Sequence, residues 1–397
     1  MLVYCVMFLL SEIVAFWASN GSYKSKVMFE ISTHFHVLEV KKYKKVILQK
    51  YQTFFFWLSM LPFWLVASLR YYVGTDYGVY IRRQIPHVMA KTEYAKRKVE
   101  LLYRWVIRMG MFMGNVQWVF VLTHLLILFF VWKHLKNYSE NLLWSIFVFM
   151  FGCSFNCSLN IMRQYIATAI CLYALKYIYD RKIVKYVICI LVALLFHKTS
   201  IIFLFLYFAP NIKLSRWMPM WIVVISIMFG GGIRKIIVTL ANFFGYYSNY
   251  FGGIFDKNDT QWDFFIFQFI ILVVGCYCWE GGMQKYKSLK ESDICNGGAV
   301  AKYDIQEKVL MVLQMAATIS AGLSAIIPNS TRIIMMFSLG QVVYLPLFLR
   351  RLKDQKKNYL IISVMLIILY LLMFFRVIIM RKVGETLPYR FVPFLQL

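Results

Sequence analysis

The sequence predicts an all-α protein, built as a polytopic bundle of transmembrane helices. Of its 397 residues, 61% are hydrophobic and only 16% are charged, and apolar runs recur at lengths that cross, or nearly cross, a bilayer. An ordinary soluble domain does not have this composition. The chain carries 44 Lys and Arg against 18 Asp and Glu, and the basic residues cluster in short loops between the apolar runs, where they set orientation and meet anionic lipid. We therefore expect a lipid bilayer, and no nucleic acid, as a partner.

About eleven apolar segments follow one another along the chain. The first has no basic region before it and no small-residue cleavage site, so we interpret it as a retained span and not as a signal peptide. No internal repeat or low-complexity linker interrupts the series, which predicts a single transmembrane domain over residues 1–397. The segments cover residues 2–18, 52–69, 115–132, 141–155, 161–178, 183–208, 217–230, 263–279, 309–327, 332–349 and 359–380.

The basic loops predict the orientation of these spans, because cytoplasmic loops carry an excess of Lys and Arg. Both termini are then expected outside. The segment 183–208 has to begin inside, yet Lys213 and Arg216 after it also belong inside, so a single crossing does not fit. We predict two short passes or a broken re-entrant helix, with the break at His197–Ser200 near the outer face, and about twelve passes in total. The loops assigned to the inside contain Lys41, Lys42, Lys44 and Lys45; Arg181, Lys182 and Lys185; and Arg350, Arg351, Lys353, Lys356 and Lys357.

The loop from Arg70 to Gly114 is predicted outside although it is basic. Apolar and charged side chains alternate in it at helical spacing, which predicts an amphipathic helix at about residues 90–112, lying along the membrane interface. Its charges predict two i,i+4 pairs, Glu93 with Arg97 and Glu100 with Arg104. The alternative is a cytoplasmic basic loop, with inverted topology up to this point.

The outer end of the second predicted span carries the first candidate site, Leu69–Tyr77. Gly74 allows a tight turn, Asp76 supplies a carboxylate, and Arg70 supplies a five-donor fork suited to phosphate. We add Tyr72 and Tyr77 as candidate substrate contacts. A salt bridge between Arg70 and Asp76 that closes the turn explains the same spacing equally well.

The fifth predicted span opens with a second candidate site. Asn160, Arg163 and Gln164 lie within about one turn of a helix N-terminus, where the dipole favours anions. A diphosphate would fit there. The alternative is an arginine whose side chain only reaches for the interface.

Two further ionisable residues lie at predicted outer ends. His197 stands at the break in 183–208, and a lone histidine in such a place is as often structural as functional. Arg332 opens another span after Asn329–Thr331. Ionisable groups at membrane depth are costly unless they are paired or contact water or substrate, so Arg70, Arg163, His197 and Arg332 together predict a pocket for an anionic guest.

The sequence lacks the motifs of several common chemistries. The eight cysteines are scattered, and Cys276 and Cys278 have no second ligand pair nearby, so no metal site is predicted. The sequence contains no P-loop and neither an H-E-x-x-H nor a G-x-S-x-G motif. An ATP-driven pump and the commoner membrane hydrolases are therefore disfavoured.

Three motifs together resemble one family. They are R-Y-x-V-G-T-D-Y at 70–77, N-x-x-R-Q-x-I-A at 160–167 and A-x-x-F-H-K-T-S at 193–200. In a polytopic chain of this length, the combination resembles the EpsG family of Wzy-like bacterial exopolysaccharide polymerases. The likeness extends from the second span to the C-terminal region.

The resemblance implies a glycosyltransferase of the bacterial inner membrane, which joins oligosaccharide repeat units carried on undecaprenyl diphosphate at the outer face. It implies no cofactor, because the donor is already activated, and it makes a chain-length regulator and a flippase candidate partners. Capsule, exopolysaccharide and O-antigen are the products of such enzymes. In this interpretation Arg70, Arg163 and Arg332 bind the diphosphate, and Asp76, or else His197, is the catalytic base.

Two other functions compete with this one. A flippase or other transporter for the same lipid-linked sugar would also use broken helices and buried cations, but would offer them near the midplane or to both faces. A glycan ligase or acyltransferase would differ only in its acceptor.

Overall fold

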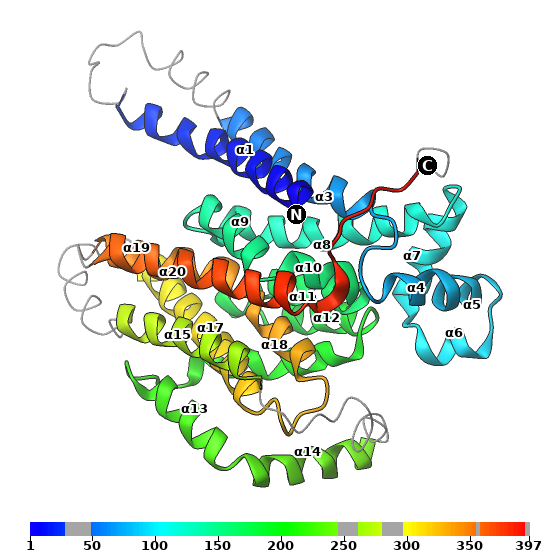
Figure 1. Cartoon of the computed structure of the whole chain (residues 1–397). Coiled ribbons are helices and arrows are strands. Elements are labelled where there is room, and N and C mark those ends of the chain that lie inside the picture. Colours follow the sequence, from blue (N-terminus) through cyan, green and yellow to red (C-terminus); the bar gives the residue numbers. More distant parts are fainter. Residues whose placement is uncertain (28–48, 245–260, 280–296, 355–357, 394–397) are drawn as a thin grey trace. The chain divides into compact units, whose positions relative to one another are not determined.

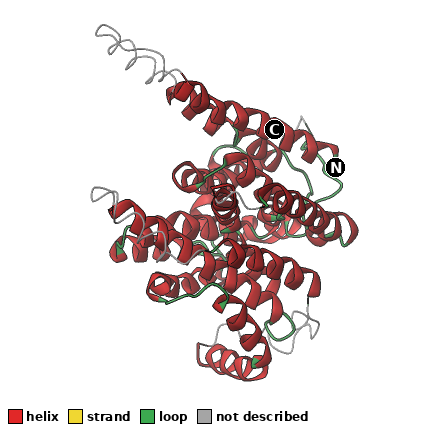
Figure 2. Cartoon of the chain, turned by 90° about the vertical axis from the view of Figure 1, so that its left-hand side faces the viewer, coloured by secondary structure: helices red, strands yellow, loops and turns green. Residues whose placement is uncertain are grey.

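The computed structural model describes residues 1–27, 49–244, 261–279, 297–354 and 358–393 (Figure 1). Lys41, Lys42, Lys44 and Lys45 of the first predicted cytoplasmic loop, and Lys356 and Lys357 of the last, lie outside the described residues. The described chain consists of helices and loops, and its only extended pairing is an isolated bridge between Arg70 and Phe391 (Figure 2). The all-α prediction is confirmed.

The chain forms two compact units. Unit 1 comprises Met1–Ile166 and Val377–Leu397, and unit 2 comprises Ala167–Arg376. In unit 1, α1 packs on α3 and α9, while α3 and α7 pack on α8. The helices of unit 1 are α1 (Leu2–Val27), residues 49–58, α3 (Leu61–Ser68), α4 (Tyr77–Val79), η2 (Tyr80–Gln84), α5 (Ile85–Met89), α6 (Glu93–Lys98), α7 (Leu101–Phe112), α8 (Gln117–Tyr138), α9 (Leu142–Phe151), α10 (Ser154–Asn160) and the start of α11 (Met162–Tyr179), followed near the C-terminus by the end of η6 (Phe375–Met380) and by η7 (Val383–Glu385).

Unit 2 is organised around α17, which packs on α13, α15, α18, α19 and η3. A buried polar network joins its helices: the Gln341 amide donates to Oε1 of Gln268 (2.6 Å) and of Gln314 (2.9 Å), and the Tyr370 hydroxyl donates to Gln341 Oε1 (2.8 Å). The helices of unit 2 are the remainder of α11, α12 (Ile183–Leu194), η3 (Lys198–Asn211), α13 (Met218–Met228), α14 (Gly230–Phe244), α15 (Trp262–Cys278), α17 (Gly297–Gly322), α18 (Ser330–Ser338), α19 (Gln341–Asp354), α20 (Tyr359–Phe374) and the start of η6.

Each of the predicted apolar segments contains helix. By length and composition, three helices of the described chain can cross a membrane alone, and up to six spans result if each of three bent helix pairs counts as one. The pair α9 and α10 bends by 51°, and α18 and α19 by 47°. The predicted break near His197 is confirmed: α12 ends at Leu194, His197 is extended (φ −160°, ψ 126°), and η3 continues as a 3₁₀ helix.

The predicted interfacial segment, at about residues 90–112, is helical, but it forms two short helices, α6 and α7, and not one. Val99 causes the break between α6 and α7, because it is extended (φ −123°, ψ 120°) and turns its side chain into the core, 2% exposed. One face of α7 packs on α8 so closely that a Cβ at Gly110 would lie 2.6 Å from the Val119 backbone nitrogen. The opposite face leaves Trp105, Met109 and Phe112 exposed, which suits a lipid surface.

Candidate functional site

The loop from Leu69 to Asp76 is paired with a segment near the C-terminus. Tyr71 N donates to Arg390 O (2.9 Å), Gly74 N to Glu385 O (3.1 Å) and Thr75 N to Gly384 O (3.0 Å). The Tyr389 hydroxyl donates to Val66 O (2.6 Å), which fixes the segment to α3. The segment 384–391, which we call the tail, therefore packs along the loop as an added strand would, although only the pairing of Arg70 with Phe391 is a regular β-bridge.

Arg70 is fully buried inside this loop. Its guanidinium donates to the backbone oxygens of Val73 (3.3 Å) and Leu159, and lies 5.0 Å from the ring centre of Phe120 and 5.6 Å from that of Tyr77. Burial lowers its pKa to about 10. The described structure gives Arg70 no ion pair, so the alternative salt bridge to Asp76 is not formed. Arg70 instead ties the loop to the end of α10.

Tyr72 and Tyr77 differ in their exposure. Tyr77 is 2% exposed and stacks on Phe120, with ring centres 4.7 Å apart, and burial raises its pKa to about 12. Its phenol therefore stays protonated at neutral pH. Tyr72 is 44% exposed with a positive φ of 48° and packs edge-on against Tyr71. Of the two, Tyr72 is the one whose ring is accessible at the surface.

Asn160 lies between two glycine backbones. Its Oδ1 accepts from Thr75 Oγ1 (3.1 Å) and from Asp76 N (3.4 Å). A Cβ at Gly74 would lie 2.7 Å from Asn160 Oδ1, and one at Gly384 would lie 2.4 Å from its Nδ2; both glycines have positive φ. The side chain of Asn160 thus sets the backbone position of Asp76, the predicted base, which is itself half-buried.

Arg163 is the second residue of α11, beside helix-terminal N–H groups that have no partner in the helix. Its side chain is 19% exposed, and Nη1 donates to Lys98 O (2.8 Å) and to the carboxylate of Glu100. The Tyr80 side chain also hydrogen-bonds Arg163. Glu100 pairs with Arg163 and Glu93 pairs with Lys96, so neither predicted i,i+4 pair is formed. Gln164, next in the chain, is 2% exposed.

Tyr80 begins η2, a π-helical turn that follows the loop of Asp76 after the short helix α4. Turns of this kind are rare in proteins, and those that occur are often found at functional sites. Its buried ring packs against Tyr103 of α7, with ring centres 5.9 Å apart. Tyr80 therefore links the Asp76 loop, α7 and Arg163.

His197 and Arg332 both belong to unit 2. The backbone oxygen of His197 accepts from Ser200 Oγ (2.7 Å), which closes the first turn of η3. Thr199 Oγ1 lies 3.4 Å from Met336 Sδ, one helical turn beyond Arg332 on α18. The break that carries His197 and the helix that carries Arg332 are thus in contact.

Unit 1 therefore contains Arg70, Tyr72, Asp76, Tyr77, Asn160, Arg163 and Gln164. In unit 2, the break that carries His197 contacts the helix that carries Arg332. That the residues of unit 1 and those of unit 2 form one pocket stays a prediction. Sequence analysis missed Glu100, Tyr80 and Gly384 as parts of the site. A sequence signal was present only for Glu100, a carboxylate in a basic segment, but local spacing assigned it to the wrong arginine.

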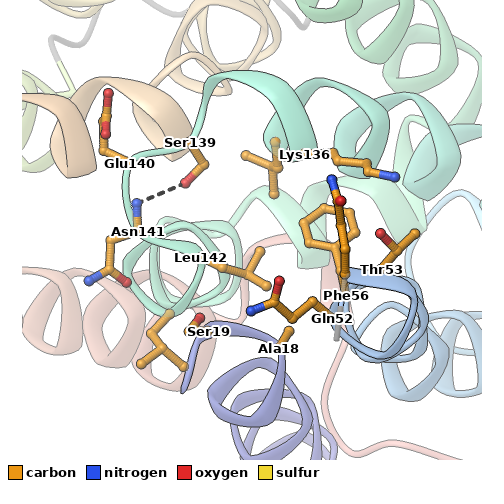
Figure 3. A pocket seen from close by; sticks show the side chains of 13 residues that line it. Ala18, Ser19, Gln52, Thr53, Phe56, Lys136, Ser139, Glu140, Asn141 and Leu142 are labelled. Carbon is orange, nitrogen blue, oxygen red and sulfur yellow. Dashed lines mark hydrogen bonds between the residues drawn. The ribbon is translucent and has the colours of Figure 1, made fainter. Parts of the chain in front are cut away.

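A separate cavity of about 450 Å³ lies at the other end of α8 (Figure 3). Lys136 and Leu135 of this helix line it, whereas Gln117 and Phe120 near the start of the helix contact the Arg70 loop. A distance of roughly 27 Å separates these ends, at 1.5 Å per residue. None of the predicted site residues lines the cavity. Its lining is Ala18, Ser19, Gln49, Gln52, Thr53, Phe56, Leu135, Lys136, Ser139, Glu140, Asn141, Leu142 and Leu143.

Within the described residues, no group of three or more His, Cys, Asp or Glu side chains could hold a metal ion. The chemistry that the site offers is anion binding by guanidinium groups, beside a carboxylate.

In the comparisons with known proteins, the model of the EpsG family matches residues 53–391. That range begins within the second predicted span and includes the bridge at Phe391. No curated protein and no solved structure is significantly similar to the chain.

Proposed function

Because the chain belongs to the EpsG family, we propose that it is a membrane polysaccharide polymerase that joins oligosaccharide repeat units carried on undecaprenyl diphosphate. The reaction takes place at the outer face of the bacterial inner membrane, and the product is an exopolysaccharide, capsule or O-antigen chain. Neither nucleotide sugar nor cofactor is needed, because the diphosphate is already the leaving group.

The proposed reaction forms one glycosidic bond and breaks another bond. A sugar hydroxyl of the incoming lipid-linked unit attacks the anomeric carbon of the growing chain. The bond from that carbon to the diphosphate oxygen breaks, and undecaprenyl diphosphate departs with the electron pair. The hydroxyl proton passes to a carboxylate or imidazole. Two things are therefore required of the protein, namely cations at the departing oxygens and one base.

Arg163 is the proposed principal cation. The observation that carries this proposal is the ion pair with Glu100: the guanidinium is partly exposed, lies at a helix N-terminus and already binds an anion. Arg332 is the proposed second cation. Arg70, whose guanidinium is buried against backbone oxygens, supports the loop and contributes long-range positive charge.

Asp76 is the proposed base and His197 the second candidate. Asp76 is half-buried, and its backbone is held by Asn160, so the carboxylate is presented at a defined position. Tyr72 is exposed beside it and offers an aromatic face to a sugar ring.

The test is complementation of a host that lacks its own polymerase. Arg163→Ala, Asp76→Ala and His197→Ala variants are expressed at matched membrane levels, and polymer length is read as a ladder on a gel. We expect Arg163→Ala and at least one of the other two to give only single repeat units. Lys96→Ala, which removes an exposed cation of α6, is the matched control and should keep the full ladder. Full ladders from all three site variants would refute the proposed site.

A further inference from the structure

The junction between α6 and α7, residues 98–100, covers Arg163. The backbone oxygen of Lys98 and the carboxylate of Glu100 both accept from the same guanidinium nitrogen. Glu100 is the N-cap residue of α7, and its side chain is 9% exposed in this pair. The position at which Arg163 would bind a diphosphate oxygen is therefore occupied by a carboxylate of the same chain.

A diphosphate and the Glu100 carboxylate cannot share that position without strong repulsion, because like charges in a partly buried site disfavour each other. One of them has to leave. A carboxylate released into a half-buried position also requires a new partner, since an unpaired buried charge is costly.

Arg104 offers that partner. It lies one helical turn beyond Glu100 on α7, at the i,i+4 distance over which Glu and Arg side chains reach each other. Its Nε is buried and has no hydrogen-bond partner in the described structure. A buried guanidinium donor without an acceptor is uncommon and calls for an explanation. The carboxylate of Glu100, moved from Arg163, would satisfy it.

We propose that Glu100 is a two-position counter-ion: it binds Arg163 while the site is empty and moves to Arg104 when the lipid diphosphate takes its place. This proposal rests on the proposed function, because it assumes that Arg163 binds the diphosphate. Glu100 is thus a positioning residue, which keeps the Arg163 guanidinium in place and moves away when the substrate binds.

The move also connects binding to the interfacial helices. Glu100 caps α7, whose exposed Trp105, Met109 and Phe112 face away from α8. Removing the carboxylate from Arg163 loses one contact between the junction and α11, whereas the contact of Lys98 O with Arg163 remains. The lipid carrier would then reach Arg163 from the side of α7.

The test measures binding of undecaprenyl diphosphate to the purified full-length protein in nanodiscs, with inorganic pyrophosphate as the lipid-free comparison. Glu100→Gln keeps the size of the side chain but removes the competing charge, so we expect both ligands to bind about tenfold more tightly. A merely structural role for Glu100 would predict weaker binding or no change. Glu93→Gln, the same substitution at an exposed ion pair of α6, is the matched control and should leave both affinities unchanged.

The second arm concerns Arg104. Arg104→Met removes the partner of the released carboxylate, so we expect about tenfold weaker binding in that variant, and no further weakening when Arg104→Met is added to Glu100→Gln. If the Arg104→Met variant does not fold, the Arg104→Gln variant is used in its place for the same measurement. Arg108→Met, one turn further along α7, controls for the loss of a cation.

The outcomes separate this proposal from the proposed function. If Arg163→Gln binds undecaprenyl diphosphate as well as the unmodified protein does, the diphosphate site itself is wrong. If Arg163→Gln loses binding and Glu100→Gln does not bind more tightly, only the counter-ion proposal fails. If Glu100→Gln binds more tightly but Arg104→Met has no effect, Arg104 is not the second position.

Discussion

Arg70 and Arg163 lie in the same unit, and their surroundings assign them different tasks. Arg70 is fully buried, donates to two backbone oxygens and lies near the rings of Tyr77 and Phe120. Arg163 is partly exposed and binds a carboxylate. A buried guanidinium that satisfies carbonyl groups stabilises the fold, whereas a partly exposed one can exchange its anion.

This difference predicts unequal effects of the two alanine substitutions on stability. Arg70→Ala leaves the Val73 and Leu159 carbonyls unpaired and creates a cavity, at a cost of about 3 kcal/mol. The melting temperature of the purified protein should then fall by about 5 °C or more. Arg163→Ala should change it by much less. Arg390→Ala, an exposed arginine of the tail, is the control, and equal melting temperatures for Arg70→Ala and Arg390→Ala would contradict the anchoring role.

The contact between Gly384 and Asn160 gives a second prediction. An added Cβ at Gly384 would lie 2.4 Å from Asn160 Nδ2, and the φ of +78° disfavours any side chain. Gly384→Ala should therefore displace Asn160 and the backbone of Asp76, with loss of most polymerisation. Gly78→Ala is the matched control, because nothing lies within 4 Å of a Cβ there. A Gly384→Ala variant that makes full-length polymer would show that the position of Asn160 does not matter.

Among the helices, the features that depend on local sequence pattern were predicted from the sequence. Apolar runs placed helix in each expected segment, and the polar residues His197–Ser200 marked the break between α12 and η3. The partner of Glu100 was not predictable in the same way. Spacing along one helix proposes Arg104, but the fold brings Arg163 to Glu100 from 63 residues away, and tertiary proximity decides the pair.

The site in unit 1 could be predicted by residue type but not by role. The motif around Arg70 indicated a cation beside a turn, and the turn is present. Whether that cation is buried depends on Phe120, Leu159 and the tail, which no local pattern connects to it. The role of Gly384 could not be predicted for the same reason, because no local pattern connects it to Asn160.

The glutamine network of unit 2 predicts how its helices are held together. Gln341→Leu removes the amide that donates to Gln268 Oε1 and Gln314 Oε1 and the oxygen that accepts from the Tyr370 hydroxyl, although Gln268 Oε1 still accepts from Gln314 Nε2. We expect the free energy of unfolding to fall by about 2 kcal/mol. Interhelical hydrogen bonds within membranes average only about 0.6 kcal/mol each, but a buried donor or acceptor that loses its partner adds to that cost.

Denaturation of the purified protein by SDS measures this loss. Tyr370→Phe, which removes a single hydrogen bond, is the graded comparison and should cost less than Gln341→Leu. If Gln341→Leu is as stable as the unmodified protein, packing alone holds these helices.

For the molecule as a whole, the orientation in the membrane can be tested directly. Single cysteines are introduced at Tyr72, Lys136, Lys198 and Lys213 in a background without the native cysteines, and are labelled by an impermeant maleimide. Positions 72 and 198 should react in intact cells, because both lie at predicted outer ends. Positions 136 and 213 should react only after permeabilisation.

The result also decides the alternative for the basic segment. If position 72 reacts only after permeabilisation while 198 reacts in intact cells, the chain before residue 115 has the inverted topology. The proposed assembly of Arg70, Arg163 and Arg332 at one face would then be wrong.

The pairing of the Arg70 loop with the tail has a consequence for biosynthesis. The Tyr389 hydroxyl bonds to Val66, 323 residues earlier in the chain, so the loop cannot acquire its final backbone partners until the ribosome has made almost everything between them. A nascent chain that stalls before that point would be inserted in the bilayer and yet be inactive. Folding of the site is thus completed only when the last residues have been made, and we expect no incomplete chain to be active.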